Sequence, residues 1–232
     1  MHFCETYWQT ARLRRDKVVS LHRVLSVTQL TAGTCLIRFT REGLAYQSGQ
    51  YLLLGIPGGD LREYSIFSRP QDSWLEILVR VIPDGSVSAQ LARLTPGDSI
   101  KVEGVQGSFT VPLDCEHQKF IFVATGTGIA PFHSIVGDFP EIDYQLYHGV
   151  RHASECYARE AFAADRYHAC LSGECGGVGT YAGRVTQVLY DVSLPLNAAC
   201  YLCGSCDMIY EVFAMLQAKG IPRAQIHTET YY

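Results

Sequence analysis

The sequence predicts two domains of different construction, an antiparallel β-barrel followed by an α/β domain with a parallel sheet. Short β-rich segments separated by turn residues fill the first half, whereas strands alternate with helices in the second half. With 232 residues, 47% of them apolar, the chain is long enough for one or two domains with ordinary cores. We expect an N-terminal arm over residues 1–17, the barrel domain over 18–115 and the α/β domain over 116–232.

The first half contains five segments of strand-like composition, bounded by turns such as Pro96-Gly97-Asp98. Residues 62–70 also read as a strand, and residues 86–94 carry apolar side chains at helical spacing. Five to six strands at this spacing are typical of an antiparallel barrel or sandwich. The five expected strands are residues 18–27, 34–42, 49–56, 75–82 and 98–107.

The second half changes character near residue 116, where buried-type strands begin to alternate with helices. This alternation predicts a parallel sheet with crossover helices. The expected strands are residues 119–125, 144–150, 167–174 and 198–204. A loop and then a helix are expected over residues 126–139, with further helices over 159–166, 183–192 and 208–220.

Composition narrows the class of protein. The formal net charge of −4 argues against a nucleic-acid partner, because such proteins are usually basic. The odd number of cysteines, nine, predicts a reducing cytoplasm rather than a disulfide framework. No apolar run reaches the roughly 18 residues of a membrane span, and the N-terminus lacks the apolar core of a signal peptide.

A glycine-rich turn joins the first strand of the second half to its helix. Such a turn lets backbone approach a pyrophosphate, and free N–H groups at the start of the helix attract it; an ordinary tight turn is the alternative. Two later arginines, Arg151 and Arg184, suit a 2′-phosphate and favour NADP over NAD, unless they are merely solvated. The turn consists of Gly126, Thr127, Gly128, Ile129, Ala130 and Pro131.

Four further segments have the order found in a known family. They are Arg62-Glu63-Tyr64-Ser65, Val79-Arg80-Val81 followed by Gly85-Ser86-Val87-Ser88, Cys203-Gly204 with Met208, and Glu229-Thr230-Tyr231-Tyr232. Together with the glycine-rich turn they resemble the ferredoxin–NADP⁺ reductase superfamily. The resemblance extends from about Val18 to Tyr232 and is strongest to the bacterial ferredoxin/flavodoxin–NADP⁺ reductases.

The resemblance implies FAD contacts in the first half. Arg62 would pair with the flavin pyrophosphate, Tyr64 would pack on the isoalloxazine, and Ser65 would lie near flavin N5. The diphosphate contacts favour FAD over FMN. The remaining FAD contacts implied are Glu63, Val79, Arg80, Val81, Gly85, Ser86, Val87, Ser88 and Thr127.

The same resemblance assigns the residues of the second half. Cys203 would lie beside the nicotinamide C4, and Glu229 near the nicotinamide and N5, so that both join Ser65 as catalytic residues. Tyr231 would stack on the isoalloxazine until nicotinamide displaces it, and Tyr232 would cover the FAD adenine. The NAD(P) contacts implied are the six residues of the glycine-rich turn, Arg151, Ser172, Arg184, Cys203, Gly204 and Met208.

The chain departs from the bacterial relatives at one point. Their Ser-Arg-Glu triplet grips the 2′-phosphate, whereas the matching residues here are Ser172-Gly173-Glu174, which leaves NAD possible as the coenzyme. No metal site is expected. The spacing of Cys200, Cys203 and Cys206 lacks a fourth ligand, and His148, His152 and Cys156 are expected to be ordinary surface or core residues. No plant-type iron–sulfur spacing occurs, so we expect any cluster to reside on a separate partner.

The resemblance implies an FAD-dependent oxidoreductase. It would exchange hydride between NADP(H), or NADH, and flavin, and single electrons with ferredoxin or flavodoxin. One alternative is an NAD(P)H-dependent reductase of free flavin or of an oxygenase component; the two terminal tyrosines weigh against free flavin. Another is a non-catalytic electron-transfer subunit that binds FAD alone. The cations of the arm, which suit an acidic ferredoxin or are simply solvated, are Arg12, Arg14, Arg15 and Lys17. The oligomeric state is left open.

Overall fold

The computed structural model describes residues 19–83, 85–114, 117–175 and 180–231. The expected arm with its four cations, and Tyr232, lie outside the described residues. So do residues 115 and 116, and the division of the chain into domains at that point stays a prediction.

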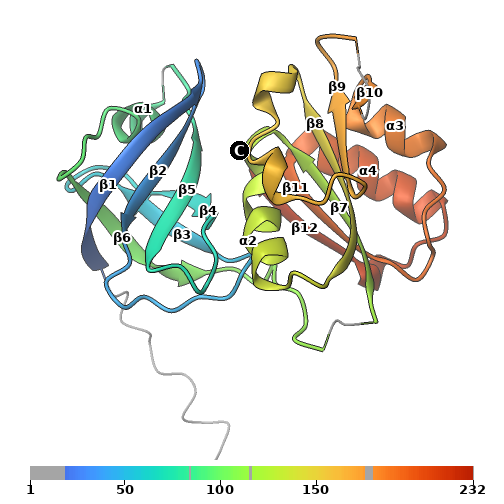
Figure 1. The fold of residues 1–232 in the computed structure, drawn as a ribbon, viewed down its shortest axis with the longest axis horizontal. Helices are drawn as coiled ribbons and strands as arrows, with labels where there is room; N and C mark the ends of the chain where they lie inside the picture. Colours follow the sequence, from blue (N-terminus) through green and yellow to red (C-terminus); the bar gives the residue numbers. More distant parts are fainter. Residues whose placement is uncertain (1–18, 84, 115–116, 176–179, 232) are drawn as a thin grey trace, which may run out of the picture.

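The first half forms six antiparallel strands, as the sequence predicts. Their order in the sheet is β4-β3-β6-β1-β2-β5. A bridge between Ile66 and Ile77 joins the end of β4 to β5, so the sheet closes on itself as a barrel (Figure 1). The strands are β1 Val19–Thr31, β2 Thr34–Thr40, β3 Tyr51–Gly55, β4 Arg62–Ser65, β5 Trp74–Arg80 and β6 Ser99–Gln106.

The barrel interior is filled by alternate side chains of these strands, among them Ile37, Phe39, Leu52 and Leu54, all fully buried. The helix α1, Ser86–Leu91, covers one end with Val87 and Leu91. The helix that the sequence predicts over residues 86–94 therefore forms, but it ends three residues earlier.

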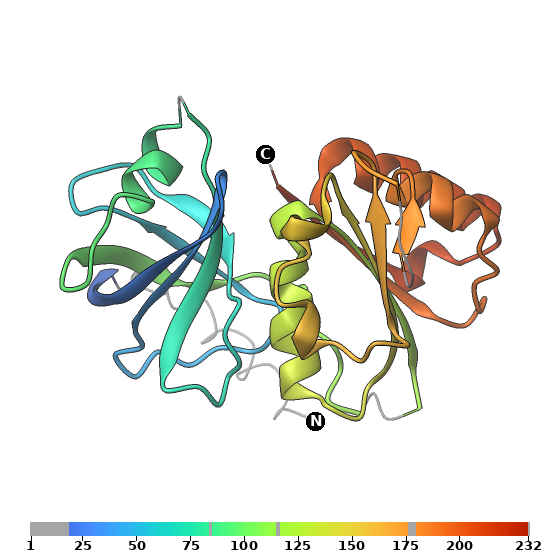
Figure 2. The same cartoon turned by 45° about the horizontal axis from the view of Figure 1, so that its top comes forward.

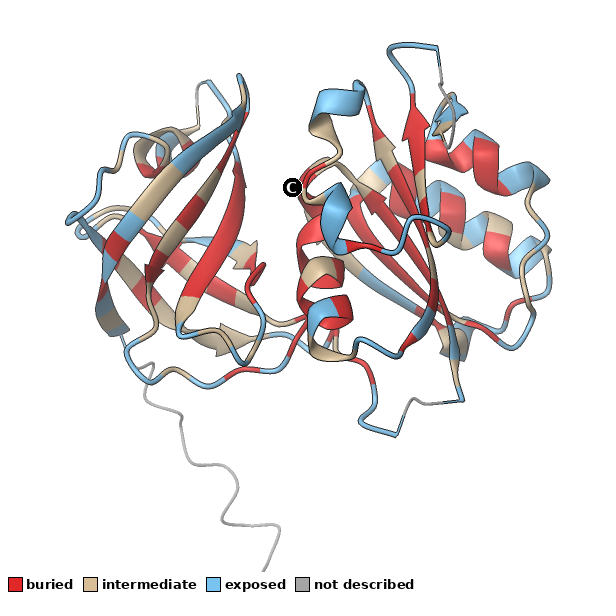
Figure 3. Cartoon of the chain, viewed as in Figure 1, coloured by how far each residue is buried: buried red, intermediate tan, exposed pale blue. Residues whose placement is uncertain are grey.

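The second half is a parallel sheet with the order β10-β9-β8-β7-β11-β12. Helix α2 lies on the side of the sheet that faces the barrel, and α3 and α4 cover the other side (Figures 1 and 2). Figure 3 shows how the central strands are buried between these layers. The elements are β7 Lys119–Thr125, η1 Gly126–Ile129, α2 Ala130–Asp138, β8 Asp143–Val150, η2 Ala153–Glu155, η3 Arg159–Ala161, β9 Tyr167–Leu171, β10 Thr180–Ala182, α3 Val185–Asp191, β11 Ala199–Ser205, α4 Cys206–Ala218, η4 Arg223–Gln225 and β12 Ile226–Tyr231.

The structure corrects one expected helix and adds two strands. The helix predicted over residues 159–166 is wrong, because only the short 3₁₀ turn η3 forms between Ala158, with φ 52°, and Phe162, which is extended and buried. Strands β10 and β12 were not expected. Strand β12 pairs with β11 in parallel and runs toward the barrel (Figure 2). No helix among the described residues is long and apolar enough to cross a membrane.

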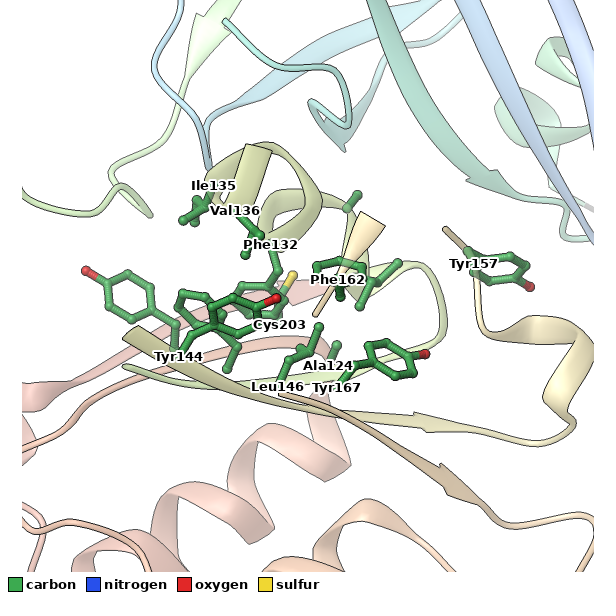
Figure 4. Close-up of a cluster of buried hydrophobic side chains, with 14 of the residues drawn as sticks. Ala124, Phe132, Ile135, Val136, Tyr144, Leu146, Tyr157, Phe162, Tyr167 and Cys203 are labelled. Carbon is green, nitrogen blue, oxygen red and sulfur yellow. The ribbon is translucent and has the colours of Figure 1, made fainter. Parts of the chain in front are cut away.

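The two halves share one hydrophobic cluster. Phe67 and Leu78 of the first half belong to the same buried cluster as Phe132 of α2. His133, also on α2, stacks on Phe67 with ring centroids 3.7 Å apart, and its Nδ1 lies 2.8 Å from the Phe67 carbonyl oxygen. Figure 4 shows the other side of this cluster, where Phe132 lies over the sheet. Helix α2 therefore fixes the barrel against the sheet.

Candidate active site

A cleft of about 1650 Å³ lies between the barrel and the parallel sheet. It lies where the carboxyl ends of the parallel strands meet the barrel, which is the usual place for a ligand of an open α/β sheet. The residues expected from the sequence that line it are Arg62, Glu63, Tyr64, Ser65, Arg80, Val81, Gly85, Ser86, Val87, Ser88, Gly126, Thr127, Arg151, Ser172, Arg184, Gly204, Met208, Glu229 and Tyr231.

The barrel contributes strand β4 and the segment around α1 to this cleft. Arg62 is exposed and Tyr64 is half-buried, and burial raises the pKa of Tyr64 to about 12, so its hydroxyl keeps its proton at neutral pH. The Ser88 hydroxyl accepts a hydrogen bond from the backbone N–H of Ile82 at 3.1 Å, which holds the turn before α1. Val79 lies elsewhere, since it is fully buried in the barrel core.

The glycine-rich turn forms the floor on the α/β side. Gly126 has φ 53°, the left-handed region, and an added Cβ there would face open space. A Cβ on Gly128 would instead lie 2.3 Å from the Cys203 carbonyl oxygen, so close packing of η1 against β11 requires glycine. The remaining residues of the turn are buried below the cleft and do not line it; they are Ile129, Ala130 and Pro131.

Ser65, Glu229 and Tyr231 form a hydrogen-bonded chain across the cleft. The Tyr231 hydroxyl donates to Ser65 Oγ at 2.7 Å, and Ser65 Oγ donates to Glu229 Oε1 at 2.5 Å. Burial is the main cause that raises the pKa of Glu229 to about 7, partly opposed by the hydrogen bond from Ser65. This site therefore holds a carboxyl group that gains and loses its proton near neutral pH.

Cys203 lies directly beside this chain. It pairs with Glu229 in the parallel register of β11 and β12, and it is fully buried below the cleft. Burial raises the pKa of its thiol well above the usual value, so Cys203 is a neutral thiol. The next residue, Gly204, has φ 137°, and an added Cβ would lie 2.2 Å from Thr125 Oγ1. Glycine is therefore required at position 204 by the fold alone.

The expected coenzyme residues line the far part of the cleft, where Arg151, Ser172 and Arg184 are all exposed. Gly173, the departure from the bacterial triplet, has a local explanation: a Cβ there would lie 2.6 Å from Arg151 Cγ. Glu174 accepts a hydrogen bond from the Ala153 N–H at 2.6 Å, so its carboxylate is already engaged.

Several residues that line the cleft escaped the sequence reasoning. Glu155 lies beside Arg151 and accepts its backbone N–H at 2.8 Å, and Asp207 and Glu211 come from α4. The Tyr157 hydroxyl donates to Thr34 Oγ1 at 2.8 Å and links the two walls. Of these residues only Asp207 could have been expected from the sequence, because acidic residues are common in the first turn of a helix. Among the described residues no group of three His, Cys, Asp or Glu side chains is arranged to hold a metal.

These residues fit a dinucleotide that carries a flat ring system. The cleft offers exposed arginines for a diphosphate, two half-buried tyrosines for a ring face and a buried hydroxyl between them. Its volume exceeds the range of roughly 300–1,000 Å³ that is typical of a pocket for a single small molecule. The donor set and the size therefore fit FAD with room beside it.

Comparison with known proteins points to the same family. The family described as the oxidoreductase FAD-binding domain matches residues 22–111. The ferredoxin–NADP reductase of Pseudomonas aeruginosa is 30% identical over 232 residues, covering 86% of this chain and 89% of that protein. The electron transfer component of toluate 1,2-dioxygenase from Pseudomonas putida is 30% identical over 225 residues, 90% of this chain but 66% of its own length.

The fold agrees with these relatives. A ferredoxin NADP⁺ reductase from Neisseria gonorrhoeae, solved with bound FAD and NADP, superposes with a TM-score of 0.81 at 23% identity and covers 92% of this chain and 99% of its own. The chain spans only 59 to 66% of the toluate and terephthalate dioxygenase reductases that it matches. By its FAD-binding domain, its two-domain fold and its match to nearly all of a ferredoxin–NADP reductase, this chain belongs to the ferredoxin–NADP⁺ reductase superfamily.

Proposed function

We propose that this protein is an FAD-dependent reductase that takes electrons from NADPH or NADH and passes them singly to a ferredoxin- or flavodoxin-type protein. The observation that carries the proposal is the chain of Tyr231, Ser65 and Glu229 at the centre of the cleft. It joins Ser65 of the barrel to Glu229 and Tyr231 of the parallel sheet by hydrogen bonds. FAD, when bound, supplies the redox chemistry that joins a two-electron carrier to a one-electron carrier.

The protein side of this function is binding and orientation. Arg62 and Arg80 are exposed at the cleft and supply charge for a diphosphate, whereas Tyr64 and Tyr231 supply aromatic faces. Ser65 offers its hydroxyl beside the ring position, and Cys203 packs below it. Holding two reactants in contact in this way lowers the barrier by removing the entropy of their encounter.

Glu229 is proposed to hold a proton at this site. Because burial raises its pKa to about 7, the carboxyl group is protonated in part of the molecules at neutral pH. Its partner Ser65 lies 2.5 Å away, so a proton at Glu229 Oε1 is coupled to the Ser65 hydroxyl. In the protonated form, Glu229 places no charge in this buried part of the cleft.

NADPH is the proposed coenzyme, with NADH as the alternative. Arg151 and Arg184 at the cleft supply positive charge suited to a 2′-phosphate. The glycine at position 173 and the carboxylate of Glu155 beside Arg151 reduce that advantage. We also propose a cytoplasmic location, since the seven cysteines that the structure describes are all free.

A second candidate function is the reductase component of an oxygenase. The likeness to the toluate dioxygenase electron transfer component, over 90% of this chain, supports it. The two candidates share the flavin and the cleft, and they differ in the coenzyme and in the protein that receives the electrons.

An anaerobic absorbance titration of the purified protein with NADPH and NADH in parallel tests the proposal. A yellow protein bleached by low NADPH and only by high NADH supports the reductase of ferredoxin or flavodoxin. Preference for NADH favours the oxygenase component. A yellow protein that neither coenzyme bleaches indicates a non-catalytic FAD-binding subunit, and a protein that cannot take up FAD overturns the assignment.

A further inference from the structure

His148 is a buried polar residue that the proposed function does not use. It lies on β8 with no exposed surface, and both ring nitrogens have partners. Nε2 lies 2.8 Å from the carbonyl oxygen of Gly126, and Nδ1 lies 2.7 Å from the hydroxyl of Tyr167 on β9. Gly126 is the first residue of the glycine-rich turn, and it directly follows β7, the strand that pairs with β8.

These two contacts fix where the ring proton resides. A carbonyl oxygen only accepts, so Nε2 must carry the hydrogen that bonds to Gly126. Burial lowers the pKa of His148 to about 4, so at neutral pH the ring has a single N–H. Nδ1 then accepts from the Tyr167 hydroxyl, whose own pKa is raised, chiefly by burial. The Gly126 carbonyl thus sets the tautomer, and the Tyr167 hydroxyl, which can donate or accept, completes the arrangement as the donor to Nδ1.

Holding the Gly126 carbonyl also orients the next amide. In a trans peptide the C=O and the N–H point in opposite directions, so the N–H of Thr127 points away from His148. The first amides of a helix have no acceptor within it, and Thr127 is the second residue of η1. Gly126 and Thr127 both line the cleft, whereas His148 lies below them.

We propose that His148 is a positioning residue for the nicotinamide coenzyme: by bonding the Gly126 carbonyl it aims the Thr127 amide into the cleft, at a diphosphate oxygen. This inference rests on the proposed function. FAD carries a diphosphate as well. Measuring coenzyme binding and flavin retention independently distinguishes which of the two diphosphates the Thr127 amide binds. Gly126, whose carbonyl accepts this bond, has the left-handed φ of 53° that glycine adopts most readily.

Two substitutions of His148 separate its two bonds. Gln can place its amide nitrogen where Nε2 lies, so it keeps the bond to the Gly126 carbonyl. The shorter Asn can place an amide oxygen only where Nδ1 lies, so it keeps the bond from the Tyr167 hydroxyl and loses the one to Gly126. In the FAD-loaded protein, we expect His148→Asn to raise the KM and the Kd of NADPH and NADH by about tenfold. This factor corresponds to the upper end of the net free energy of one hydrogen bond. The value of kcat and the FAD content should stay close to wild type, and His148→Gln should restore coenzyme binding.

Unchanged KM and Kd in His148→Asn would overturn the proposal. Loss of FAD with unchanged coenzyme affinity would overturn it too, since the amide would then serve the flavin. Tyr167→Phe adds a matched test: Nδ1 loses its donor while the bond from Nε2 to Gly126 remains, so coenzyme affinity should fall by less than in His148→Asn.

An NMR measurement on the wild-type holoprotein tests the inference without any variant. The ¹⁵N shifts of the His148 ring should show hydrogen on Nε2, and the Thr127 amide should shift when NADP⁺ or NAD⁺ is added. Hydrogen on Nδ1, or an unmoved Thr127 amide in a protein that binds coenzyme, contradicts the proposal. Failure of the proposed function looks different, because then neither coenzyme perturbs the flavin spectrum of the wild type.

Discussion

At the scale of single residues, Glu229 links burial to pH. Its native pKa of about 7 lies above the usual value of 4.5, so between these values the folded protein binds more protons than the unfolded chain. Stability from this group is present below pH 4.5 and is lost as the pH rises through 7. We expect Glu229→Gln to gain stability over wild type progressively across that window in thermal melts at matched pH. A difference that stays constant from pH 4.5 to 8 would contradict the raised pKa.

Tyr231 makes a second prediction at this scale. Its hydroxyl donates to Ser65 and its ring lies in the cleft, so Tyr231→Ser should clear the place where a nicotinamide would enter. We expect affinity for NADP⁺ and NAD⁺ to rise about fivefold, since a displaced stacking ring costs on the order of 1 kcal/mol. Difference spectra measure the change. Tyr210→Ser, at an exposed position on α4, is the control, and equal affinity in both variants would sink the stacking role.

At the scale of elements, the glycine-rich turn is packed against β11. A Cβ on Gly128 would lie 2.3 Å from a backbone oxygen, whereas a Cβ on Gly33, in the turn between β1 and β2, would meet nothing within 4 Å. We expect Gly128→Ala to cost about 1–3 kcal/mol of unfolding free energy, as overpacking does, and Gly33→Ala to cost far less. Urea denaturation compares the two, and equal costs would show that the turn yields without strain.

The elements also show what the sequence could not predict. Strand β12 contains a polar run, His227 to Thr230, and pairs only with β11 at the edge of the sheet, so it lacks the apolar pattern that predicts the other strands. The segment after Arg159 has helix-forming residues, yet buried Phe162 is held extended by its packing on Tyr167. In the segment after Arg159, tertiary packing overrides the local helix preference.

The site was predictable to the extent that it is local in sequence. The order of the motifs was sufficient to predict that most of the expected residues line one cleft, and their contacts with FAD and coenzyme stay predictions. It did not reveal that Ser65 bonds both Glu229 and Tyr231, because that contact joins positions more than 160 residues apart, nor that Val79 faces the barrel core. The bond of His148 to Gly126 was not predicted either, because it joins residues that are 22 positions apart in the chain.

At the scale of the whole molecule, the shared cluster around Phe67 predicts coupled unfolding. Phe67 is buried against α2, whereas Phe39 is buried in the barrel alone. Each Phe→Ala change should lower the free energy of unfolding by about 3–5 kcal/mol. Only Phe67→Ala should split the calorimetric transition into two, because it weakens the packing between the barrel and α2. A single transition in both variants would show that other contacts, such as Ser134 Oγ to the Ser68 carbonyl at 2.7 Å, are sufficient.

The pairing of Ser65 with Tyr231 has a consequence for synthesis on the ribosome. Domains fold in the order in which they emerge, so the barrel can close while the α/β half is still being translated. Ser65 then has no hydrogen bond from Tyr231, which lies 166 residues later in the chain, until that residue is synthesised. Strand β12 is the latest of the described strands to emerge and joins the sheet at its edge. A nascent chain therefore lacks the hydrogen bonds of Ser65 until that edge strand is added, and a chain released too early would carry an open cleft.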